Sequence, residues 1–312
     1  MRKIIVILTV LVMSASMLSM SAGCGGSSGS EKINAESADN SQSNNSNKSD
    51  SITDSQDNSS EEEAAKSTEL EEAVIVDNEY CTFSIKGLEK DSIWGYSLKL
   101  FIENKTDKEL MFSMDKVSVN GFMCDPFWGT TVTAGMKAND EASFLNSSLE
   151  SIGVETPSYF EFELRVYDDN DWSADPFVED YFSYGNPEEV STITTDNMQV
   201  VFENDTCSMY VAGFDNDNIW GYTMTLYLEN KSDNNLMFSA DGVAVNGYMC
   251  DPFWGTEVVA GKRAIADVSW SDSDFEENDI ETVKEITFPV RVYDSDDWSA
   301  DSYVDDTFTI VP

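Results

Sequence analysis

Residues 95–104 read Gly-Tyr-Ser-Leu-Lys-Leu-Phe-Ile-Glu-Asn, and residues 221–230 read Gly-Tyr-Thr-Met-Thr-Leu-Tyr-Leu-Glu-Asn. In both stretches large apolar side chains stand at every second position, with mostly polar side chains between them. Successive side chains of a strand point to opposite faces, so this period of two is typical of a half-buried antiparallel strand. Each stretch therefore predicts a β-strand.

The two stretches belong to an internal repeat with a constant offset of 126 residues. Residues 81–178 align with residues 207–304 without a gap, and 49 of the 98 paired residues are identical. Copies of about 115 residues have the size of an independent domain and are too long for a solenoid repeat. We therefore expect two modules, the first at 71–185 and the second at 196–312, joined by a linker at 186–195.

Turn residues separate further alternating runs in each module. Residues 160–166 and 286–292 repeat the period of two, and the acidic runs 168–171 and 294–297 follow them. The Asn-Gly pairs at 120–121 and 246–247 predict hairpins with positive φ at both turn positions. Each module should thus have about seven short strands and at most one helical turn, near residues 147–152. The predicted fold is all-β: two tandem immunoglobulin-like antiparallel β-sandwiches.

The composition describes an acidic folded protein without histidine. The 312 residues include 59 Asp plus Glu against 18 Lys plus Arg, a formal net charge of -41, and 41% are hydrophobic, which is normal for a globular protein. The negative charge argues against nucleic-acid binding. Histidine-dependent catalysis and imidazole-ligated zinc are excluded. Paired carboxylates, as in glycoside hydrolysis, leave an enzyme open as an alternative, but acids this abundant pair by chance, and we expect no enzyme.

The N-terminus has the pattern of an export signal. Met1-Arg2-Lys3 precedes an apolar run that ends near Leu18, which is shorter than the roughly 20 residues that span a bilayer. Residues 21–24 read Ser-Ala-Gly-Cys and resemble the lipobox of bacterial lipoproteins, although Ser21 stands where that family usually has Leu. The resemblance implies a signal peptide at 1–23 and a diacylated Cys24 that anchors the chain to the outer face of the cell membrane. The alternative is an ordinary signal peptide that is cleaved nearby.

Residues 24–70 are expected to form a disordered tether. Ser and Asn dominate this segment, and residues 25–70 contain no aromatic residue, so that the segment cannot bury enough apolar surface to offset its conformational entropy. The tether would lift the folded modules away from the membrane.

Three segments of the first module resemble the telokin-like, immunoglobulin-fold domains of Gram-positive lipoproteins. Residues 103–108 read Glu-Asn-Lys-Thr-Asp-Lys, residues 117–121 read Val-Ser-Val-Asn-Gly, and residues 134–140 read Ala-Gly-Met-Lys-Ala-Asn-Asp. The second module keeps Glu-Asn-Lys at 229–231 and Val-Asn-Gly at 245–247, but its third segment, at 260–265, is degraded. The resemblance implies an immunoglobulin fold, a mostly unassigned function and no shared catalytic residues.

Each module contains two cysteines at the same spacing, Cys81 with Cys124 and Cys207 with Cys250. In an exported protein such repeated pairs indicate one disulfide per module. The alternative is buried thiols that pack as small hydrophobic side chains.

The acidic turns after residues 167 and 293 suggest a cation site. Oxygen ligands at alternating positions suit Ca²⁺, although a Trp occupies the third ligand position of an EF-hand pattern. The candidate ligands are Asp168, Asn170, Asp175, Asp294, Asp296 and Asp301. The alternative, which we favour, is a hairpin turn stabilised by its own Asp side chains, with no cofactor.

Six tryptophans form matched pairs between the modules. Aromatic side chains beside carboxylates are typical of carbohydrate-binding surfaces, whereas sandwich domains also use Trp in their cores and to anchor loops. The six are Trp94, Trp128, Trp172, Trp220, Trp254 and Trp298.

Together these patterns predict a non-enzymatic cell-surface lipoprotein that displays two modules for binding or structural interaction. Its partners would be the membrane, through the lipid, and an unidentified envelope protein or glycan; nucleic acid is not expected. The alternative is a carbohydrate-binding surface module that uses loop Trp and Asp residues.

Overall fold

The computed structural model describes residues 70–91 and 95–312. The signal peptide, Cys24, the predicted tether and Trp94 lie outside the described residues, so the predictions made for them stay predictions. The described residues of both modules belong to one compact unit. Within the described part of the chain, no helix is long and apolar enough to cross a membrane.

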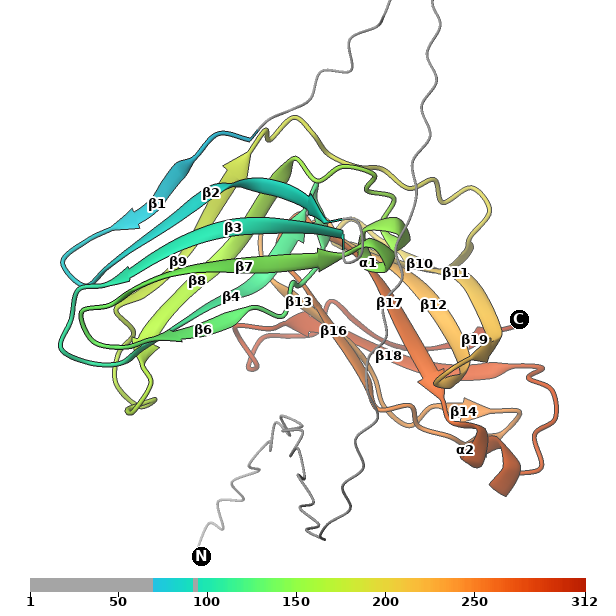
Figure 1. Ribbon diagram of the computed structural model, residues 1–312. Helices are drawn as coiled ribbons and strands as arrows, with labels where there is room; N and C mark the ends of the chain where they lie inside the picture. Colours follow the sequence, from blue (N-terminus) through green and yellow to red (C-terminus); the bar gives the residue numbers. More distant parts are fainter. Residues whose placement is uncertain (1–69, 92–94) are drawn as a thin grey trace, which may run out of the picture. The chain divides into compact units, whose positions relative to one another are not determined.

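The first module consists of two antiparallel sheets and one short helix, α1 (Asn146–Ser151) (Figure 1). One sheet has the order β1 (Ala73–Asp77), β2 (Cys81–Asp91), β3 (Gly95–Asn104), β7 (Lys137–Leu145). The other has the order β5 (Phe122–Met123), β4 (Leu110–Val119), β8 (Tyr159–Asp168), β9 (Val178–Gly185), and β6 (Gly129–Val132) also pairs with β4.

The second module repeats this arrangement. One sheet has the order β10 (Gln199–Glu203), β11 (Cys207–Asn218), β12 (Gly221–Asn230), β17 (Arg263–Trp270). The other contains β15 (Tyr248–Met249), β14 (Ala244–Val245), β18 (Ile286–Asp294), β13 (Leu236–Ala240) and β16 (Trp254–Val258), with β19 (Val304–Ile310) on β18. The helix α2 (Asp272–Glu277) stands at the position of α1. The offset of 126 residues therefore holds from the first strand of each module to its last.

The all-β prediction is confirmed, and the apolar periodicity explains it. The side chains that alternate along β3 and β8 are buried between the sheets, among them Leu98, Leu100, Phe162 and Leu164. Both Asn-Gly pairs have positive φ at both positions, as expected; Asn120 has φ 48° and Gly121 has φ 85°. Each module contains more strands than the seven expected, because short pairings such as β5 carry little periodicity. No strand or helix lies in the predicted linker.

The two modules are joined by a contact that the sequence did not predict. β17 of the second module pairs in parallel with β5 of the first through Arg263 and Phe122. The backbone N–H of Arg263 donates to the carbonyl oxygen of Gly121 at 3.1 Å. The segment at 260–265, which departs from the telokin-like pattern, thus contributes to the junction between the modules.

Candidate functional site

The structure separates the candidate tryptophans into buried and exposed pairs. Trp128 is buried in the core of the first module, where its ring lies 5.8 Å from that of Phe83, and its Nε1 donates to Asp140. Trp254 is half-buried against Phe288. Both side chains pack on the core of their module, and the buried Trp128 is not available as a sugar platform.

Trp172 and Trp298, in contrast, are 73% and 75% exposed. Each packs on a tyrosine of the preceding strand, with ring centroids 5.1 Å apart for Tyr167 and 5.5 Å apart for Tyr293. Both copies therefore present a largely exposed indole beside a tyrosine ring. Trp220 is also exposed, and the corresponding Trp94 lies outside the described residues.

In each acidic turn the first Asp forms hydrogen bonds within the turn itself. Asp168 binds the Lys108 ammonium through Oδ2 at 2.7 Å, and its Oδ1 accepts the backbone N–H of Asn170. Oδ1 of Asp294 accepts the N–H of Asp296 in the same way. Asp175 and Asp301 are exposed. No group of three His, Cys, Asp or Glu within residues 70–91 and 95–312 is arranged to hold a metal ion, and the turns have the self-bonded form that we favoured.

The four cysteines in the described part of the chain are buried and free, so neither predicted disulfide is present: not Cys81 with Cys124, nor Cys207 with Cys250. Burial raises the pKa of Cys81 to about 11 and that of Cys124 to about 12. The structure thus contains the alternative, thiols that pack as small hydrophobic side chains.

Strand register explains why the pairs stay apart. Cys81 pairs with Asn104 across the β2–β3 ladder. The Asn104 side chain donates to the carbonyl of Val132, and Val132 pairs with Leu110, the first residue of β4. Cys81 therefore lies near the start of β4. The N–H of Cys124 donates to Val117, seven residues further along β4. Seven residues of strand span about 23 Å, whereas a disulfide needs Cα atoms within about 7 Å. The repeated spacing reflected the duplication rather than a bond.

A loop shared by both modules exposes a phenylalanine in strained backbone. The sequence Asp-Pro-Phe-Trp occurs at 125–128 and at 251–254; we call these segments the DPFW loops. Phe127 is 95% exposed and Phe253 is 99% exposed, with φ of 49° and 48°. A positive φ is a genuine outlier for a bulky residue and costs about 1–3 kcal/mol. Asp125 and Asp251 hold the bend by accepting the Phe N–H.

The sequence pattern points to the neighbouring Trp of each DPFW loop and not to the Phe. The identity of the loop in both copies marked it as important, but adjacent aromatic residues give no signal of which ring faces solvent. That choice depends on the positive φ at the Phe, which no local pattern reveals.

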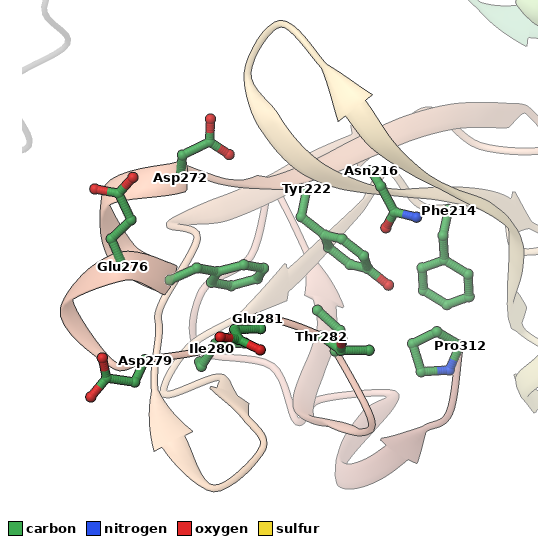
Figure 2. Close-up of a pocket in the computed structure, with 12 residues that line it drawn as sticks. Phe214, Asn216, Tyr222, Asp272, Glu276, Asp279, Ile280, Glu281, Thr282 and Pro312 are labelled. Carbon is green, nitrogen blue, oxygen red and sulfur yellow. The ribbon is translucent and has the colours of Figure 1, made fainter.

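The second module also contains a pocket of about 930 Å³ at the end of its β11–β12 hairpin (Figure 2). Phe214 and Asn216 from β11, Tyr222 from β12 and Phe275 from α2 contribute to its wall. The segment that follows α2 supplies the remaining wall, including Glu281. The volume is within the range of small-molecule sites.

Tyr222 carries a buried hydroxyl group without a hydrogen-bond partner among the described residues. The residue is 8% exposed, and its side chain lies in the pocket among the other lining residues (Figure 2). Burial raises the pKa of Tyr222 to about 12, so the phenol stays protonated at neutral pH. Buried hydroxyl groups are rarely left unpaired, because desolvation without a hydrogen bond costs about 1–3 kcal/mol. A water molecule or a polar ligand group in the pocket would satisfy it.

Comparisons with known proteins do not identify a family. No family model matches the chain, and no curated protein matches it. A solved complex of the Salmonella enterica SafA pilin with the SafB chaperone shows 11% identity and a TM-score of 0.18, covering 69% of this chain and 89% of that chain. Red sea bream transglutaminase shows 10% identity and a TM-score of 0.19, covering 72% of this chain and 30% of that chain. Similarities at these TM-scores carry no argument, and the resemblance to telokin-like lipoproteins stays a prediction.

Proposed function

We propose that this protein is a non-enzymatic binding protein on the outer face of the cell membrane, anchored by lipid on Cys24, and that its two modules engage an envelope protein or glycan through the DPFW loops. The observation that carries the proposal is the pair of Phe127 and Phe253. Both copies place a nearly fully exposed aromatic side chain on backbone that is costly to maintain. Strain of this kind persists where it is part of a binding or switching site.

Two identical loops in one chain support bivalent binding. Once one loop is engaged, the second binds at a high effective concentration, so that avidity exceeds the affinity of either loop alone. The acidic composition, with a net charge of -41, favours partners with cationic groups.

The test replaces the exposed rings by the residue that suits their backbone. Phe127→Gly and Phe253→Gly remove the side chain and relieve the positive φ, so we expect the free energy of unfolding to stay unchanged or to rise. Binding of the full chain, carrying Cys24→Ser to remove the lipid, is measured on envelopes of the source organism. We expect the double variant to lose about a hundredfold in apparent affinity and each single variant about tenfold.

The matched control changes an exposed apolar pair elsewhere. Val74 and Val200 occupy equivalent positions on β1 and β10 and are both exposed. Val74→Ala with Val200→Ala should bind as the parent does. Equal binding by the double glycine variant and the parent would remove the DPFW loops from the proposal.

A carbohydrate-binding surface remains the second candidate, now centred on Trp172 and Trp298. Their exposed indole faces, supported by Tyr167 and Tyr293, have the form on which sugar rings stack. A glycan array distinguishes the two candidates. A hit that disappears with Trp172→Ala and Trp298→Ala but survives the glycine variants supports the sugar-binding function.

A further inference from the structure

The duplication allows the pocket of the second module to be compared with the same corner of the first. Tyr96 stands at the position of Tyr222, and its hydroxyl donates to the carbonyl oxygen of Glu155 at 3.3 Å. Leu149 and Val154 are buried there, whereas the equivalent Phe275 and Ile280 are only half-buried. The corner is thus closed in one copy and open in the other.

The first module places its own cation on this tyrosine. The Nζ of Lys90 lies 5.3 Å from the centroid of the Tyr96 ring, within the distance of a cation–π interaction. The equivalent residue in the second module is Asn216, which lines the pocket. In the described part of the chain no lysine or arginine lies over the Tyr222 ring.

The rim of the open pocket is also more acidic than that of its closed counterpart. Asp272 and Asp279 replace Asn146 and Gly153, and Glu276 and Glu281 are retained from the first module. The pocket lining contains no basic residue. Four carboxylates therefore line the pocket, and the ammonium group that Lys90 supplies in the first module is absent from it because Asn216 stands at that position.

We propose that the pocket of the second module binds a primary alkylammonium group, which takes the place that Lys90 occupies in the first. The Tyr222 ring is flanked by Phe214 at 5.9 Å and Phe275 at 5.8 Å, so the alkyl chain packs along the pocket side of these rings, and one N–H of the ammonium group donates to the Tyr222 hydroxyl oxygen. The carboxylates of the rim attract the charge. No residue of a DPFW loop lines the pocket, so this site can fail or succeed independently of the proposed surface binding.

The same chemistry is offered by a lysine side chain of a partner and by a free alkylamine, and two probes separate these sources. Nα-acetyl-lysine N-methylamide represents the side chain, and n-butylammonium represents the free amine. Nα-acetyl-norleucine N-methylamide has a similar apolar chain without the charge. Each is titrated into the full chain carrying Cys24→Ser, with binding measured by calorimetry and by amide chemical shifts of Asn216, Tyr222 and Thr282.

We expect at least one ammonium probe to bind about tenfold or more tightly than the norleucine probe, and the better of the two ammonium probes identifies the source. Asn216→Lys should abolish binding, because the new lysine places its own ammonium group where the probe would bind, as Lys90 does in the first module. The matched variant Lys90→Asn should leave the measured affinity of the second-module pocket unchanged. Tyr222→Phe should weaken binding about fivefold without lowering the free energy of unfolding, because it removes only the unpaired hydroxyl.

Three results would overturn the proposal: equal affinity for the norleucine probe, undiminished binding by the Asn216→Lys variant, or no shift of the three amides at about 10 mM of either ammonium probe. If the Phe127→Gly and Phe253→Gly variants lost binding to envelopes but still bound the ammonium probes, the pocket would be a binding site independent of the DPFW loops.

Discussion

Lys108 and Asn234 occupy equivalent positions in the two modules, and each binds the equivalent carboxylate of its own module by a different interaction. Lys108 forms an ion pair with Asp168, while Nδ2 of Asn234 donates to Oδ2 of Asp294 at 2.8 Å. The hydrogen bond from Lys108 holds the pKa of Asp168 below its ordinary value. A carboxyl group whose pKa is lowered by folding stabilises the native state above its unfolded pKa, and this contribution is lost as the pH falls through the folded pKa.

Lys108→Asn should therefore keep the hydrogen bond and lose the charge. We expect the pKa of Asp168 to rise toward its ordinary value, measured by the pH dependence of its carboxyl carbon resonance. The difference in unfolding free energy between parent and variant should be present at pH 7 and disappear at acid pH, once Asp168 is protonated in both states. An unchanged pKa of Asp168 in the variant would show that the ammonium group is not its cause.

At the level of single residues, the sequence predicted the conformation of turns more reliably than it predicted which side chains are buried. The Asn-Gly hairpins and the self-bonded acidic turns have the expected form because a few local atoms determine them. The exposure of Phe127 beside the buried Trp128 depends on how the loop meets β4, where the N–H of Met114 donates to the carbonyl of Trp128. The pocket at Tyr222 is formed by side chains from β11, β12 and α2 that only the folded structure brings together.

Among the secondary-structure elements, a buried asparagine side chain forms hydrogen bonds with three segments of each module. Nδ2 of Asn104, at the end of β3, donates to the carbonyls of Lys108 and Val132 at 2.8 and 2.7 Å. Its Oδ1 accepts the N–H and the hydroxyl of Thr106. Asn230 makes the same bonds in the second module. The sequence predicted a polar turn here, but not that its first residue is buried and links β3 to β6.

Asn104→Ala should destabilise the first module by about 3 kcal/mol, because two carbonyl groups, one of them buried, lose their donor. Thr106→Ala is the control, since it removes only one hydroxyl group and should cost about 1 kcal/mol. Both values are measured by chemical denaturation, and Asn230→Ala should reproduce the larger value in the second module. A cost for Asn104→Ala no larger than that of the control would contradict the role of the buried amide.

At the scale of the whole unit, divergence between the copies explains how the modules are joined. Tyr210, Tyr227 and Ile265 of the second module replace Ser84, Phe101 and Asn139 of the first. Tyr210 and Tyr227 are buried in the core cluster of the first module, and Ile265 packs against it. The Tyr227 ring meets that of Phe122 edge-on at 6.3 Å. Sequence analysis treated the two copies as equivalent, so it could not predict which sheet of the second module would bind its neighbour.

An ion pair between Glu161 and Lys262 completes this junction. Nζ of Lys262 lies 2.6 Å from Oε2 of Glu161, and both side chains are largely buried. Lys262→Glu should cost about 3 kcal/mol, because it leaves two carboxylates facing each other in a partly desolvated site. We expect the parent to unfold in a single calorimetric transition and the variant to unfold in two, one for each module. Adding Glu161→Lys should restore the attraction and most of the cooperativity.

The control for this charge reversal is the more exposed pair of Lys137 and Glu103, which lies within the first module. Lys137→Glu should change the free energy of unfolding by about 1 kcal/mol or less and leave a single transition, because solvent screens exposed charges. If Lys262→Glu unfolded in one transition at the parent temperature, the buried aromatic contacts alone would couple the modules. The double variant, Lys262→Glu with Glu161→Lys, gives the decisive result. If Lys262→Glu only lowered stability in general, the second substitution would lower it further. If the ion pair couples the two acidic modules, its re-formation with reversed charges restores the single transition.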